Sequence, residues 1–137
     1  MFSHSKPGVV LISALYTLGL MSVLLVGLVM VVITELQIVD NYKGAHLAFL
    51  GAQSGVEDGI HFLQSNSAWT SGFSNKAGPS GSGYTYTVTV QNNDPFVTLV
   101  STGQASVYSK TVRATVMVMG SPSTTPYRVR IDRWEEL

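Results

Sequence analysis

The feature that most constrains this chain is a run of 25 residues, 9–33, that contains no charged side chain. About 20 predominantly apolar residues are enough for a helix to cross a bilayer. A Lys or Asp at the centre of such a helix would cost roughly 2.5 to 3.5 kcal/mol of insertion free energy, and the run contains neither. The run therefore predicts a transmembrane helix.

A cleaved secretory signal peptide is the alternative interpretation of an apolar N-terminal run. Its apolar core usually spans about 7 to 15 residues and ends at a small-x-small cleavage site, and residues 9–33 fit neither feature. Lys6 precedes the run, whereas the first charge after it is that of Glu35. Because positive flanks stay in the cytoplasm, we expect a cytoplasmic N-terminus and the remainder of the chain outside.

Beyond the run, apolar residues continue to recur at spacings of one, three or four as far as Leu63. This pattern predicts an amphipathic continuation of the same helix over residues 34–64, and no proline interrupts it. Its solvent-facing side would carry the polar residues Glu35, Asp40, Lys43, Gln53 and Glu57.

Three glycines repeat at every fourth position of this continuation, Gly51, Gly55 and Gly59. Such a stripe lacks side chains, so another backbone or a sheet can approach it closely. Each glycine costs about 1 kcal/mol of helix propensity relative to alanine, so we expect a packing partner that compensates. The alternative is simple tolerance of glycine in a helix that tertiary packing stabilises.

Residues 65–83 are rich in Gly, Ser and Asn, which predicts a loop. Trp69 and Phe73 lie within it, and we expect them to pack against a small adjacent core, with ligand stacking by Trp69 as the alternative. A turn is expected at Asn92–Pro95, where the polar side chains are turn formers before they are calcium ligands.

From residue 84 onward, β-forming residues alternate with polar ones, which predicts strands. The expected strands cover residues 84–91, 96–102 and 111–118, and a short final strand begins at residue 127 and ends in residues 134–137. We predict that residues 84–137 form an antiparallel meander whose apolar face is covered by the helix, through Val56, Ile60 and Leu63. The expected fold class is therefore α+β.

The composition speaks against several kinds of chemistry. The chain has no cysteine, which excludes disulfides and thiolate metal sites. Eight Lys and Arg balance eight Asp and Glu, so the basic footprint of a nucleic-acid-binding protein is missing. His4, His46 and His61 are too scattered for a metal cluster, and no nucleophile elbow or phosphate loop occurs. We expect no enzyme, no metal and no cofactor.

Lys6, Pro7 and Gly8, directly before the apolar run, resemble the class III leader of type IV prepilins, although a plain Lys-Gly pair is more usual there. The resemblance implies a leader over residues 1–8, recognised through Lys6 and Gly8. It also implies that prepilin peptidase cuts between Gly8 and Val9 and that Val9 is then N-methylated.

The stretch from Asn41 to Glu57 and the C-terminal Arg133-Trp134-Glu135 are similar to PilX-like minor pilins and K-type minor pseudopilins. The fifth residue of the implied mature chain is Ser13, where this pilin-like family usually has glutamate. In major pilins that glutamate is thought to neutralise the terminal amine of an adjoining subunit, because an unpaired charge in lipid is costly. A subunit without it is suited to the tip of a filament.

The resemblance implies a structural subunit of a type IV pilus or a type II secretion-like filament. Such a subunit is held in the inner membrane until it is extracted into an extracellular or periplasmic filament. Its partners would be other pilin subunits through the N-terminal helix, prepilin peptidase and the inner-membrane assembly platform. The alternative function is a single-pass, membrane-anchored β domain that binds a ligand or partner at the cell surface, and an adhesive tip pilin would combine both.

Overall fold

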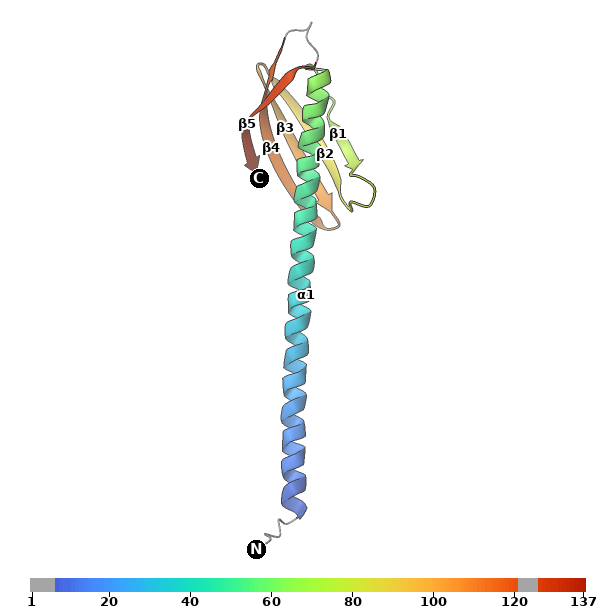
Figure 1. The fold of residues 1–137 in the computed structure, drawn as a ribbon, viewed down its shortest axis with the longest axis vertical. Helices are drawn as coiled ribbons and strands as arrows, with labels where there is room; N and C mark the ends of the chain where they lie inside the picture. The colour runs from blue at the N-terminus through green and yellow to red at the C-terminus, as the bar shows by residue number, and fades with distance from the viewer. Residues whose placement is uncertain (1–6, 121–125) are drawn as a thin grey trace. The chain divides into compact units, whose positions relative to one another are not determined.

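One helix precedes an antiparallel sheet in this chain, as seen in a computed structural model that describes residues 7–120 and 126–137. Helix α1 spans Pro7–Ser65. The strands are β1 (Phe73–Ala77), β2 (Thr85–Asn93), β3 (Phe96–Ala105), β4 (Tyr108–Met119) and β5 (Arg128–Glu136) (Figure 1). The chain forms two compact units, Met1–Asp40 and Asn41–Leu137, and we call the second unit the head.

Helix α1 begins and ends where local chemistry favours it. Pro7 occupies its first position, where the fixed φ of proline suits a helix and its missing N–H costs nothing. At the other end, the side chain of Asn66 accepts a hydrogen bond from the amide of Ala68, which turns the chain out of the helix. The amide of Tyr127 donates to the carbonyl of Gln64 at 2.9 Å, so one of the free C-terminal carbonyls is satisfied.

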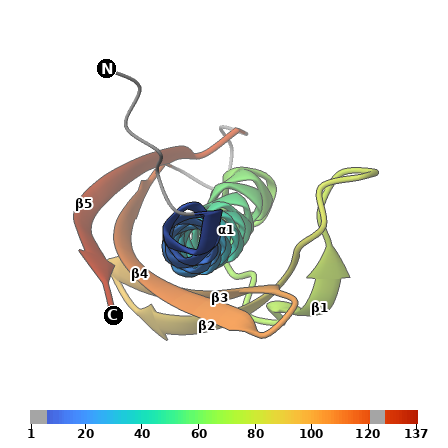
Figure 2. The same ribbon diagram turned by 90° about the horizontal axis from the view of Figure 1, so that it is seen from below.

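The five strands lie in the order β1-β2-β3-β4-β5, and every neighbouring pair is antiparallel. The predicted meander is therefore confirmed, together with the α+β class of a long apolar N-terminal helix and an antiparallel sheet. Within the head, the sheet curls around the C-terminal part of α1, with β1 and β5 at its two edges (Figure 2).

The core of the head lies between that part of the helix and the concave face of the sheet. Val56 and Leu63 are fully buried there, in one cluster with valines of β2 and β4 such as Val88 and Val112. This is the packing that the apolar pattern predicts. Ile60 is only partly buried and lies at the border of the cluster.

The strands extend further than their sequence pattern predicts. The range 65–83, predicted as a loop, contains β1, and β3 and β4 extend into residues 103–110, which lie between two strands in the sequence pattern. In both cases the neighbouring strand supplies backbone partners, and these decide the structure where the side-chain pattern is weak. Trp69 is buried and stacks on Phe62 at a centroid distance of 5.3 Å, so its predicted packing role is confirmed.

Candidate functional site

The N-terminal part of α1 is a candidate membrane anchor. Each side chain from residue 8 to residue 40 is exposed, and the most apolar window of the helix has a mean hydropathy of 2.5. By length and composition, the helix can cross a membrane. Water is a poor solvent for such a surface, so an apolar environment is needed to cover it.

The hydroxyl groups in this segment are satisfied within the helix itself. Ser13 Oγ donates to the carbonyl oxygen of Val10 at 3.0 Å, and Ser22 Oγ donates to that of Leu18 at 2.9 Å. Thr17 bonds in the same way to the carbonyl of Ala14. A hydroxyl without a partner in hydrocarbon would cost several kcal/mol, about 4 to 8 on a water-to-cyclohexane scale, and these bonds remove that cost.

The residues of the implied leader lie at the start of this segment. Lys6 is outside the described residues. Gly8 and Val9 lie in the first turn of α1, and both are exposed. Ser13, the position without glutamate, lies one turn further along the same helix.

The glycine stripe lies inside the head, against the sheet. Gly51, Gly55 and Gly59 are all buried. A Cβ added at Gly55 would stand 2.2 Å from Ser101 Oγ, and one added at Gly59 would stand 3.1 Å from Leu99 Cδ1. The stripe is thus the surface on which the helix meets β2 and β3.

A glycine on the sheet completes this close approach from the other side. A Cβ added at Gly103 would stand 2.0 Å from the carbonyl oxygen of Ala48 and 2.2 Å from the amide nitrogen of Ala52. Any side chain at Gly103 would therefore push the helix off the sheet. Nearby, Ser101 is fully buried, and its hydroxyl has no hydrogen-bond partner among the described residues.

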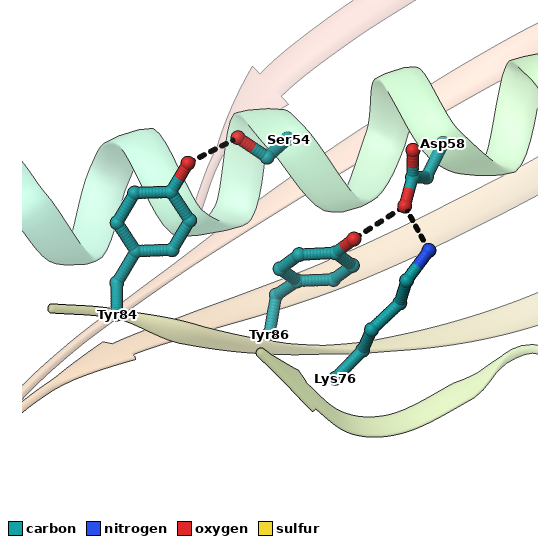
Figure 3. Close-up of polar contacts among 5 residues, drawn as sticks. All are labelled: Ser54, Asp58, Lys76, Tyr84 and Tyr86. Atoms are coloured by element: carbon teal, nitrogen blue, oxygen red, sulfur yellow. Dashed lines mark hydrogen bonds and ion pairs between the residues drawn. The ribbon is translucent and has the colours of Figure 1, made fainter. Parts of the chain in front are cut away.

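Tyr84, directly before β2, and Tyr86 within β2 hydrogen-bond to the helix beside this stripe (Figure 3). The hydroxyl of Tyr84 and Ser54 Oγ share a hydrogen bond of 2.9 Å. The hydroxyl of Tyr86 donates to the carboxylate of Asp58, and Lys76 Nζ of β1 donates to the same oxygen at 2.5 Å. One carboxylate of the helix therefore holds both β1 and β2.

The charges of this cluster shift one another's proton affinity. Burial alone would raise the pKa of Asp58, but the hydrogen bonds from Lys76 and Tyr86 and the charge of Lys76 together lower it. The hydrogen bond to Asp58 raises the pKa of Lys76, and burial together with the same carboxylate raises the pKa of Tyr86. All three groups therefore keep their ordinary charge states over the neutral range.

The hydrogen bonds of Asp58 are not evident from the sequence, because nothing in the apolar pattern distinguishes Asp58 from the neighbouring Glu57, which is expected to face solvent. Asp58 instead makes the contacts above, whereas Glu57 is exposed. A signal was present in the spacing: Ser54 and Asp58 are one helical turn apart, about 6 Å, and Tyr84 and Tyr86 are separated by about 6.6 Å along a strand. Side chains at these spacings can pair one to one across a helix–sheet contact.

The histidines and carboxylates of the described residues do not gather into a metal site. No group of three or more His, Asp or Glu side chains there is placed to hold a metal ion. His46 and His61 lie exposed on the helix, and His4 falls outside the described residues.

Comparison with family models, curated proteins and solved structures finds no match to this chain.

Proposed function

We propose that this protein is a membrane-anchored structural subunit, a minor pilin or pseudopilin of a type IV pilus or a type II secretion-like filament. The observation that carries the proposal is the continuity of α1. Its uncharged, exposed residues 9–33 run without a break into the residues that form the core of the head. One element thereby serves as membrane anchor and as core of the outer domain.

The contacts of the head support a structural role. The helix is fastened to the sheet by the glycine stripe and by the tie from Asp58 to Tyr86 and Lys76. A helix held in this way can transmit a pull on the anchor to the folded head. The absence of glutamate at Ser13 supports placement at a filament tip, where no subunit above needs its charge.

One observation favours the alternative, an uncleaved single-pass anchor for a ligand-binding β domain. The Gly8–Val9 bond lies within the first turn of α1, directly after Pro7. A peptidase needs its substrate in an extended form, so this turn must open before cleavage. An intact leader would leave a plain membrane anchor.

The mature N-terminus distinguishes the two functions. We would express the full chain in a bacterium that has prepilin peptidase, extract it from membranes with detergent and determine its intact mass and N-terminal residue. A filament subunit should begin at Val9 and carry a methyl group. A chain that still begins at Met1 or Phe2 would favour the plain anchor.

The substitution Gly8→Val provides the matched control. No heavy atom lies within 4 Å of a Cβ placed at Gly8, so the change leaves the fold intact. It should leave the leader uncleaved while the protein stays in the membrane fraction. Release of the unaltered chain into the aqueous fraction without detergent would rule out both functions.

A further inference from the structure

Strands β1 and β5 form the two edges of the head sheet (Figure 2), and they differ in length. Strand β1 has five residues, and its pairing with β2 contains a register shift. Strand β5 has nine residues, and none of the described residues pairs with its outer edge. Unpaired backbone N–H and C=O groups on such an edge can bind an added strand.

The helix-facing side of β5 is apolar up to Trp134, with Glu136 at its end, and it is only partly covered. Residues opposite each other on neighbouring strands share a face, and Trp134 and Ile131 lie opposite the buried Ala114 and Val116. They therefore point to the side of the sheet on which α1 lies. Even so, Ile131 is 49% exposed and Trp134 is 39% exposed.

The opposite side of β5 carries three arginines and one glutamate, Glu135, which lies opposite Arg113. Arg128, Arg130 and Arg133 lie opposite Met119, Met117 and Thr115 of β4, on the face that turns away from the helix. Arg128 forms no ion pair with any residue in 7–120 or 126–137.

The two other arginines have only weak acidic partners. Arg130 pairs with Asp132 at 3.7 Å and Arg133 with Glu135 at 3.4 Å, and each pair contains an arginine side chain that is more than half exposed. Surface pairs of this kind contribute about 0 to 1 kcal/mol, so a new carboxylate can replace them readily.

From these two faces we infer that β5 binds an extended segment of another protein in which acidic and apolar residues alternate. The segment would add a sixth strand to the sheet. Its carboxylates would face Arg128, Arg130 and Arg133, and its apolar side chains would cover Ile131 and Trp134. The surface belongs to the head alone, so this inference goes beyond the proposed filament function and does not depend on it.

The opposing interpretation is that the same features protect the edge. Charged side chains and bulges keep an edge strand from pairing, and β5 has a register shift beside Asp132. Protection of this kind needs charge of either sign, however, and does not need exposed Ile and Trp on the other face. If the edge is protected, no added strand should bind to β5. If the inference is right, a strand with alternating acidic and apolar residues should bind.

The test uses the full chain in detergent micelles and a fluorescently labelled synthetic peptide of alternating Glu and Val. We expect saturable binding with a dissociation constant below about 1 mM, which is the range of weak specific association. A peptide of alternating Lys and Val, and a peptide with the Glu and Val residues in two separate blocks, should bind at least about tenfold more weakly. Amide hydrogen exchange should slow in β5 when the first peptide is bound.

The substitution Arg130→Glu should weaken binding of the Glu-Val peptide by about tenfold or more. Lys43→Glu makes the same change of charge on the exposed side of the helix and should leave binding unchanged. Equal binding of all three peptides, no binding of any, or unchanged exchange in β5 would each overturn the inference. So would protection of the β5 amides that rises with protein concentration alone, because it would show that the occupant is a second copy of this chain.

Discussion

At the scale of single residues, Gly55 is a helix position where one added methyl group would overpack the contact with the sheet. An added Cβ would stand 2.2 Å from Ser101 Oγ and 2.8 Å from Val88 Cγ2. Overpacking typically costs about 1 to 3 kcal/mol, which exceeds the gain of about 1 kcal/mol in helix propensity. Gly55→Ala should therefore lower the melting temperature of the head, by about 4 to 8 °C for each kcal/mol lost. Circular dichroism in detergent measures this.

Two further variants make that prediction specific. Gly27→Ala adds the same methyl group where no heavy atom lies within 4 Å, so it should not lower the melting temperature. Ser101→Ala removes the nearest obstructing atom, whose hydroxyl has no partner among the described residues, and should restore part of the loss in the double variant. Equal effects of Gly55→Ala and Gly27→Ala would contradict the close approach of helix and sheet.

The tie at Asp58 should give the head a stability plateau around neutral pH. Because the pKa of Asp58 is lowered by folding, its contribution is present above about pH 4 and is lost as the pH falls through the folded-state pKa. Because the pKa values of Lys76 and Tyr86 are raised, their contributions are present below about pH 10 and are lost above it.

Melting curves recorded from acid to alkaline pH test this plateau. Asp58→Asn should flatten both limbs of the profile, because the same carboxylate shifts all three groups. Lys76 and Asp58 are 43% and 38% exposed, so the effect should stay within about 1 kcal/mol. Glu57→Gln removes the adjacent, exposed carboxylate and should leave the profile as it is. A profile that responds equally to both substitutions would argue against the tie.

At the scale of elements, hydrophobic periodicity was enough to predict α1, the meander and the Val56 and Leu63 contact. It was not enough for β1, whose sequence Phe-Ser-Asn-Lys-Ala has no alternation and whose pairing comes from β2. The tie to Asp58 was missed for a related reason. Lys76 and Tyr86 are 18 and 28 positions from Asp58 in the sequence. They come close to Asp58 only because the sheet curls around the helix.

The number of lysines that the membrane anchor can accept follows from its insertion free energy. Residues 9–33 contain sixteen Leu, Ile and Val residues, which contribute about 5 to 10 kcal/mol to insertion at about 0.3 to 0.6 kcal/mol each. One central lysine costs about 2.5 to 3.5 kcal/mol, and two cost about twice that. Met21→Lys should therefore remain in the membrane, whereas the double variant Met21→Lys/Leu25→Lys, whose cost is comparable to the whole gain, should be retained only in part.

Extraction of membranes with alkaline carbonate, followed by immunoblotting of pellet and supernatant, distinguishes these outcomes. Val39→Lys is the control, because it places a lysine at an equally exposed position of α1 beyond the uncharged run. It should remain in the pellet. Retention of the double variant to the same extent as the unaltered chain would mean that residues 9–33 are not the part that holds the protein in the membrane.

At the scale of the whole molecule, the proposed function requires the anchor to leave the lipid and pack among other subunits. In lipid or in a filament core, the Ser13 hydroxyl has a low desolvation cost because it bonds to its own helix. It offers no charge to a neighbouring subunit. A glutamate at the same position would offer a partner for the terminal amine of an adjoining subunit, and the pair would be favourable because each charge alone is costly in lipid. The side chain at position 13 should therefore decide where along a filament the protein can stand.

We predict that the native chain, tagged at its C-terminus and detected by immunogold electron microscopy, labels only the ends of filaments in a host with the assembly machinery. Ser13→Glu should spread the label along the shaft. Thr17→Glu introduces the same carboxylate one turn further on, in place of another hydroxyl that bonds to its own helix, and should not spread the label. Native protein found along the whole shaft, or equal spreading by both variants, would show that charge pairing at Ser13 does not set the position of this subunit.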